Sequence, residues 1–322
     1  MKHNVKITII LLSMFLITQF IGLYVINSDP FHMTTQINNE TVVVENPSLS
    51  WIQPPEVQQE SDFGFYLGSL VFAFIFAILL FFLLTKFKID SILRGWFFIV
   101  IIISLFITFN AIFPKTTYFA IGAGILAIIL AFLKTFKRNV IVHNITELLI
   151  YPGIATIFIP ILNFWTAIVL LILISIYDIW AVWHSGIMQK MAKYQMNKIK
   201  VFSGFFVPYI SKGLRMKLKK MKKSKVKNKK IKVNLAILGG GDVVFPIITA
   251  GVILKTAFVT LPFGLPNFIG GLIPALFVTA GATTGLALLF AFSEKKKFYP
   301  AMPFITVGIF TGLILSYLFF SL

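Results

Sequence analysis

The sequence predicts an all-α, polytopic membrane protein, a bundle of nine transmembrane helices, and three observations support this prediction. Hydrophobic residues make up 58% of the 322 residues and charged residues only 12%, about half the charged share of an average soluble protein. Nine apolar segments are long enough to cross a bilayer, and Lys and Arg gather in alternate loops. Because a soluble fold of this composition lacks the polar residues to cover its surface, the bilayer must be its solvent.

The nine helices are expected where about 20 consecutive residues are apolar, the length that crosses ~30 Å of hydrocarbon. These segments are 7–26, 64–84, 95–113, 118–133, 140–159, 164–183, 235–254, 268–292 and 300–322. The first follows Lys2 and Lys6, as in a signal peptide, but it is longer than a signal-peptide core and ends without a small-residue cleavage site. We therefore expect this helix to be retained, and a single domain over 1–322 to hold all nine.

The charge of the loops tests the count of nine. With the amino terminus inside, every one of the 29 Lys and Arg residues falls in an inside segment except Lys115 and Lys255. Basic residues favour the inner side of a membrane in short loops, and a miscount by one helix would destroy the alternation. The carboxyl terminus is then outside, and we expect a multi-pass protein of the cell membrane.

Two long loops interrupt the helices. Residues 27–63 carry acids but no Lys or Arg and form an acidic extracytoplasmic loop, in which only 41–44 has a strand-like pattern. Residues 184–233 contain no acid and form a basic cytoplasmic loop between helices six and seven. Its run 212–232 is expected to face anionic lipid, which attracts each basic residue by ~1 kcal/mol, rather than nucleic acid. Residues 201–210 are expected in the membrane interface beside it.

Three acids are expected at membrane depth: Glu147, Asp178 and Asp242. An acid there costs ~2.5–3.5 kcal/mol, so it generally faces a protein interior or a water-filled cavity. Glu147 follows His143 by four residues on one helical face, and we interpret it as a helix-packing contact. Asp178 and Asp242 lie in consecutive antiparallel helices, each roughly 9–12 Å from the inner surface at ~1.5 Å per residue. Their carboxyl groups can therefore face each other in one layer.

Two carboxyl groups held close together share one proton, so that one is ionised and the other neutral. The ionised group can activate water as a general base, and the neutral one can protonate a departing amide nitrogen. The titration belongs to the pair, so neither role is assigned to either residue. Such hydrolysis needs no cofactor and no metal. The absence of Cys also excludes thiolate metal sites and a cysteine nucleophile.

Two neighbouring segments suit a working site. Gly239, Gly240 and Gly241 precede Asp242 and are expected to loosen the seventh helix, because glycine lets another backbone approach closely. The ninth helix opens with Pro300-Ala301-Met302-Pro303, also at the inner face. We expect extended backbone there, which offers an edge to which an extended substrate can add as a strand.

These residues resemble the three motifs of the presenilin and signal peptide peptidase family, the GxGD intramembrane aspartyl proteases. The motifs are Tyr177-Asp178 in helix six, Gly239-Gly240-Gly241-Asp242 in helix seven and Pro300-Ala301-Met302 at the start of helix nine. Met302 stands where the family has Leu, a volume-conserving exchange. The resemblance implies that Asp178 and Asp242 are the catalytic pair, with the other motif residues shaping the site and the substrate edge. It also implies that transmembrane segments of membrane proteins are the substrates.

Residues 242–246 resemble signal peptide peptidase, whereas the charge-derived orientation is that of presenilin, a mixture that fits an archaeal homologue. The alternative function is a proton- or ion-coupled transporter that uses the same acids, although no inverted repeat is visible. The sequence identifies neither the natural substrates nor the cleavage position, and it leaves an oligomer open. Gly281-x-x-x-Gly285 and Gly308-x-x-x-Gly312 predict close helix packing.

Overall fold

The computed structural model describes residues 5–37, 40–55, 57, 59–87, 90–137, 139–184, 194–195, 202–209, 234–256, 267–293 and 299–320. Its helices are α1 (Val5–Asn27), α2 (Asp62–Lys86), α3 (Asp90–Ile112), α4 (Thr117–Phe136), α5 (Val140–Phe158), α6 (Phe164–Ile179), α10 (Gly241–Thr256), α11 (Asn267–Phe292) and α12 (Met302–Phe320). Three short turns of helix are η1 (Ser50–Ile52), η2 (Ile159–Ile161) and the π-helical η3 (Trp180–His184), which continues α6. The strands are β1 (His32–Ile37), β2 (Glu40–Glu45), β3 (Gly204–Tyr209) and β4 (Asn234–Gly239).

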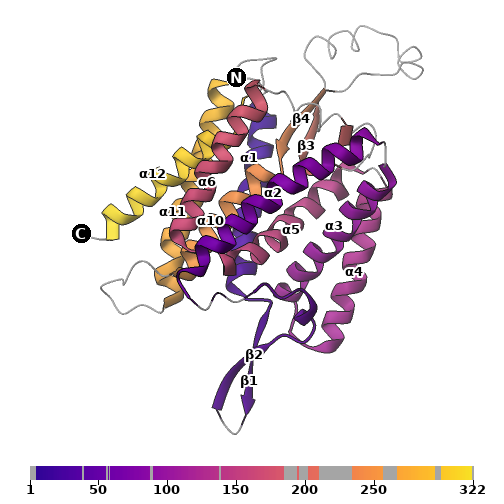
Figure 1. The fold of residues 1–322 in the computed structure, drawn as a ribbon, viewed down its shortest axis with the longest axis vertical. Coiled ribbons are helices and arrows are strands. Elements are labelled where there is room, and N and C mark those ends of the chain that lie inside the picture. Colours follow the sequence, from indigo (N-terminus) through magenta and orange to yellow (C-terminus); the bar gives the residue numbers. More distant parts are fainter. Residues whose placement is uncertain are drawn as a thin grey trace.

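Within these residues, 8 helices are long and apolar enough to cross a membrane: α1 to α6, α11 and α12. They agree with eight of the nine expected segments, which confirms a helical, multi-pass membrane protein. The strands form two antiparallel hairpins, β1–β2 and β3–β4. Figure 1 shows β1–β2 projecting from one end of the bundle, while β3–β4 and the start of α1 lie at the other end.

The prediction of a continuous helix over 235–254 is wrong at its start. Residues 234–239 form β4, which pairs with β3, and α10 begins only at Gly241. The apolar run 235–238 suits a strand as well as a helix, and the glycines that follow it start a helix poorly. With 16 residues, α10 is about 24 Å long. Asp242 therefore lies in the first turn of the helix rather than deep within it.

Three further predictions from the sequence can be compared with the structure. The segment 201–210 forms β3 where the structure describes it, and Phe205 of this strand is fully buried. The strand expected at 41–44 is confirmed as part of a whole hairpin, β1–β2. Lys134, assigned to an inner loop, is buried in the last turn of α4, where it pairs with the buried Glu147. The basic run 212–232 lies outside the described residues.

The two basic residues expected outside, Lys115 and Lys255, both lie near Asp29. The Lys115 ammonium donates to the carbonyl oxygens of Ser28, Asp29 and His32 at 2.7, 2.8 and 2.7 Å, just beyond the end of α1. Burial lowers the pKa of Lys115, and the charge of Asp29 opposes that shift. The Lys255 ammonium lies 3.6 Å from an Asp29 carboxyl oxygen. Both lysines thus serve local contacts that tie α1, the α3–α4 loop and α10 together.

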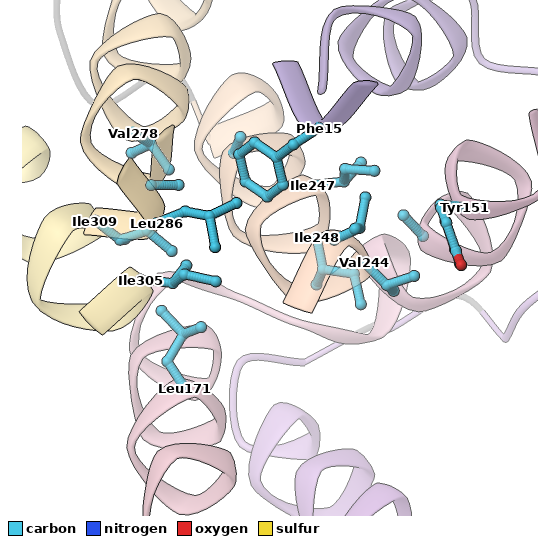
Figure 2. Packing of buried hydrophobic residues seen from close by; sticks show 14 of the residues in the cluster. Phe15, Tyr151, Leu171, Val244, Ile247, Ile248, Val278, Leu286, Ile305 and Ile309 are labelled. Atoms are coloured by element: carbon cyan, nitrogen blue, oxygen red, sulfur yellow. The ribbon is translucent and has the colours of Figure 1, made fainter. Parts of the chain in front are cut away.

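Helix α10 is the centre of the core. It contacts α1, α5, α6 and α11, and it is apolar on every side, as expected of a helix surrounded by others. Figure 2 shows its Val244, Ile247 and Ile248 among buried side chains from the neighbouring helices. The labelled neighbours are Phe15 of α1, Tyr151 of α5, Leu171 of α6, Val278 and Leu286 of α11, and Ile305 and Ile309 of α12. Asp242 is therefore attached to an element fixed from several directions.

The closest helix contact joins α11 to α12. A methyl group added at Gly281 would lie 2.1 Å from the Gly308 carbonyl oxygen, and one added at Gly308 would lie 2.1 Å from the Gly281 carbonyl oxygen. Added at Gly285, it would lie 2.3 Å from the Phe304 carbonyl oxygen. The predicted close packing at these glycines is confirmed, and it fixes α12, whose first residues belong to the site described below.

Gly281→Ala is expected to force α11 and α12 apart and to destabilise the protein by about 1–3 kcal/mol, the usual cost of overpacking. Gly122→Ala in α4 is the matched control, because nothing lies within 4 Å of an added methyl group there. That variant is expected to be neutral or slightly stabilising. Thermal unfolding of the purified protein in detergent measures both, and equal midpoints for the two variants would contradict the packing argument.

Candidate active site

Asp178 lies one residue before the end of α6, where the helix continues as the π-helical turn η3. Its side chain is buried, and its Oδ2 accepts a hydrogen bond from the Met302 N–H at 3.0 Å. Met302 is the first residue of α12, so the carboxyl group caps a helix amino terminus, where the dipole favours negative charge. The sequence places these two residues far apart, and the fold joins them.

A second contact holds α6 against α12. The hydroxyls of Ser175 and Thr306 lie 2.8 Å apart, and both are buried. Ser175 is one turn before Asp178, and Thr306 is one turn after Met302, so the two bonds are stacked on one face of the helix pair. Sequence reasoning missed this contact. The available signal was a small polar residue one helical turn from each motif, which is weak because hydroxyls often bond their own helix.

Asp242 reaches the site from the other side, at the point where β4 gives way to α10. The Gly240 carbonyl oxygen accepts from the N–H groups of Val243 and Val244 at 3.1 and 3.0 Å, which starts the helix. The Gln19 side chain of α1 donates to the Val243 carbonyl oxygen at 3.1 Å and fixes this first turn. Asp242 is half-buried, and it also lies at a helix amino terminus.

The structure brings the two predicted aspartates into one region. Helix α6 contacts both α10 and α12; Asp178 lies near the end of α6 and bonds the start of α12, and Asp242 lies in the first turn of α10. Asp178 is buried with a backbone donor, whereas Asp242 is more exposed. Two carboxyl groups in unequal surroundings can divide acid and base roles between them. Among the described residues, no group of three His, Cys, Asp or Glu is placed to hold a metal ion.

The three glycines span the junction of β4 and α10: Gly239 ends β4, Gly240 links the two elements, and Gly241 is the first residue of α10. A methyl group at Gly239 would lie 3.1 Å from Asp242 Oδ2. At Gly240 it would lie 2.8 Å from the Ser203 hydroxyl and 2.9 Å from the Tyr151 hydroxyl, whereas at Gly241 its nearest neighbour is a Phe245 ring carbon at 3.6 Å. A side chain at residue 240 would therefore clash with its neighbours, whereas a methyl group at residue 241 would not.

The Pro300–Pro303 segment differs from the extended edge that was expected. Pro300 and Ala301 are buried and irregular, but Met302 and Pro303 already belong to α12. Proline suits a first helical turn because its missing N–H needs no partner there. The segment therefore presents a helix start to Asp178. Tyr177, beside Asp178, is half-buried with its ring 6.4 Å from that of Trp180.

Sequence reasoning also missed the β3–β4 hairpin, which is the strand-like element at the site. Its two six-residue segments, 204–209 and 234–239, are apolar and bounded by glycine. Such short runs are a strand signal, but here the strands are separated by a long basic segment. Because no short turn joins the two strands, the sequence does not indicate that they pair.

Residues 41–322 match the family described as signal-peptide peptidase, presenilin aspartyl protease. The chain belongs to this family. Its fold is similar to two solved structures of a presenilin family intramembrane aspartate protease, both 18% identical in sequence. In the C222 crystal form the TM-score is 0.59 over 97% of this chain and 99% of the other, and in the P2 form it is 0.57 over 96% of each. No curated protein matches the sequence significantly.

The resemblance seen in the motifs is thus confirmed at the level of the family. The protein is an aspartic endopeptidase of the presenilin and signal peptide peptidase family, with several membrane-crossing helices.

Gly240→Ala is expected to lower the rate of peptide cleavage by about tenfold or more. Its methyl group would push the β4–α10 link away from Tyr151 and Ser203, and small misplacements of a reacting group are costly. Gly241→Ala is the matched control, since its methyl group makes only an ordinary contact. Initial rates measured in proteoliposomes check both variants. Equal losses in the two would show that crowding at Gly240 is not what matters.

Proposed function

We propose that Asp178 and Asp242 are the catalytic pair, and that they hydrolyse peptide bonds within transmembrane segments of other membrane proteins. The observation that carries this proposal is that Asp178 and Asp242 come from two contacting helices, α6 and α10, and that each carboxyl group lies at a helix amino terminus. Membership of an aspartyl protease family supports the same chemistry.

The reaction follows from one shared proton. The ionised carboxyl takes a proton from water, and the water oxygen attacks the carbonyl carbon of the peptide bond. The neutral carboxyl then protonates the amide nitrogen, the C–N bond breaks, and a new acid and a new amine leave. The Met302 N–H donates to Asp178 Oδ2, and this bond fixes the carboxyl group at the start of α12.

The substrate edge that we propose is β4 rather than Pro300–Pro303. Pro208 has no N–H and lies opposite Leu235, so this pair is not hydrogen-bonded across the hairpin. Bonded and non-bonded pairs alternate in an antiparallel hairpin. The N–H and C=O groups of Leu235, Ile237 and Gly239 therefore point away from β3. An unwound peptide that adds there as a strand runs toward Asp242, because Gly239 lies against its carboxyl group.

The proposal includes the topology and the setting. Helix α10 supplies the ninth membrane crossing. The amino terminus lies on the cytoplasmic side of the cell membrane, and cleavage takes place near the cytoplasmic surface. The single domain 1–322 then carries its acidic loop 27–63 outside and its basic loop 184–233 inside, with 212–232 against anionic lipid. The opposite positions of β1–β2 and β3–β4 in Figure 1 support this arrangement.

Purified protein reconstituted with a single-span peptide should release two fragments whose new ends flank one bond, as mass spectrometry can show. Asp178→Asn and Asp242→Asn should each lower the rate by at least about 100-fold, the scale of lost acid–base catalysis. Asp62→Asn, a partly exposed acid at the start of α2, is the matched control and should cleave normally. EDTA should have no effect. Cleavage that survives either substitution of the pair would remove this mechanism.

A further inference from the structure

The hairpin β3–β4 has two outer edges, and among the described residues side chains of α5 are bonded to the edge of β3. The outer edge of β3 is covered by side chains of α5. The Asn144 amide nitrogen donates to the Phe206 carbonyl oxygen at 3.0 Å, and the Asn144 amide oxygen accepts from the Phe206 N–H at 3.2 Å. A side-chain amide has the same donor and acceptor as a peptide unit. Asn144 thus occupies the place that a residue of a third strand would take.

The next outward-facing residue of β3 is covered in the same way. The His143 Nε2 lies 2.8 Å from the Gly204 carbonyl oxygen, so this nitrogen carries the proton and donates. The Gly204 N–H points to Glu147 Oε1 at 3.5 Å, and Glu147 is held by Lys134. The His143 ring also packs on Phe206, with centroids 4.4 Å apart. Both partners of Gly204 are buried.

This covered edge is one strand away from the proposed catalytic pair. Gly204 is the register partner of Gly239, and Gly239 lies against Asp242. Gly204 has a φ of +149°, and a methyl group there would lie 2.5 Å from the Leu238 carbonyl oxygen. The two strands are therefore in close contact at this end of the hairpin, with no room for a side chain at Gly204. A shift of β3 relative to α5 would move Gly239 and the start of α10 with it.

We propose that Asn144 and His143 are positioning residues that close the outer edge of β3 and set the place of β4. This inference rests on the proposed function. Closing one edge leaves an extended substrate a single edge of this hairpin to join, the one that leads to Asp242. The bonds from α5 to β3 also fix the position of Gly239 in β4 relative to the carboxyl groups. Neither residue touches the reacting atoms.

Asn144→Leu removes both bonds to Phe206 with little change of volume. The matched control is Asn46→Leu, because Asn46 also donates to one carbonyl (Pro30, 2.8 Å) and accepts from one N–H (Ser48, 3.1 Å), in the loop after β2. The His143→Leu and His143→Gln pair is a second test, since a Gln amide can donate to the Gly204 carbonyl where Leu cannot.

Two readouts separate positioning from general stability. Amide hydrogen exchange at Phe206 should become at least about tenfold faster in Asn144→Leu and stay unchanged in Asn46→Leu. In proteoliposomes with a single-span peptide, kcat should fall by about tenfold or more in Asn144→Leu and His143→Leu, while KM changes by less than about threefold. His143→Gln should recover most of the lost kcat, and Asn46→Leu should keep wild-type kcat.

Unchanged exchange at Phe206, an unchanged kcat in Asn144→Leu, or equal kcat losses in Asn144→Leu and Asn46→Leu would each overturn the inference. Should Asn144→Leu not fold, the His143 pair decides, and a failure of His143→Gln to recover kcat counts against positioning. A wild-type protein without peptidase activity would overturn the proposed function instead. The exchange measurement would then still decide whether α5 closes β3.

Discussion

A backbone N–H or C=O that leaves a helix inside a membrane protein must find another partner, and this requirement governs the whole site. Each unpaired group costs several kcal/mol in hydrocarbon, so irregular backbone is tolerated only within protein or beside a water-filled cavity. The chain leaves α-helical geometry at the end of α6, where the π-helical η3 follows, at the β4–α10 link and before α12. All three places lie around the same two carboxyl groups. The freed backbone groups are what the site uses, and the neighbouring helices satisfy them.

The partners of those groups come from a rigid frame. Helix α10 lies in the core, and α1 approaches it so closely that a methyl group at Gly22 would lie 2.5 Å from the Ile247 side chain. On its far half, a methyl group at Gly251 would lie 2.5 Å from the Ile159 side chain. Close-packed interiors transmit displacement rather than absorb it. The position of Asp242 is therefore set by α1, α5 and α11 as much as by its own motif.

The sequence predicted what depends on composition and on local pattern. Eight apolar segments became helices within a few residues of their expected ends, and the motif residues Asp178, Asp242 and Met302 lie at the site. The start of helix seven could not be predicted, because 235–238 is apolar enough for either a strand or a helix. The choice is made by pairing with β3, about 30 residues earlier. Long-range pairing leaves no local signal.

The polar contacts of α5 were beyond prediction for the same reason. Glu147 and His143 were correctly interpreted as a packing contact, but their partners Lys134 and Gly204 come from other elements. A buried ion pair such as Lys134–Glu147 contributes little net stability over apolar packing, although breaking it is costly. Its value here lies in holding an acceptor beside Gly204. A purely apolar α5 would pack as well and would leave the edge of β3 unsatisfied.

The same reasoning explains how two acids can remain in the bundle without a basic residue beside them. Among the described residues, neither Asp178 nor Asp242 takes part in an ion pair. A lysine or arginine at hydrogen-bond distance would hold both carboxyls ionised and end their use as an acid and a base. Helix amino termini stabilise negative charge by only about half an elementary charge each. In the mechanism proposed above, the termini of α10 and α12 favour one ionised carboxyl while the shared proton neutralises the other.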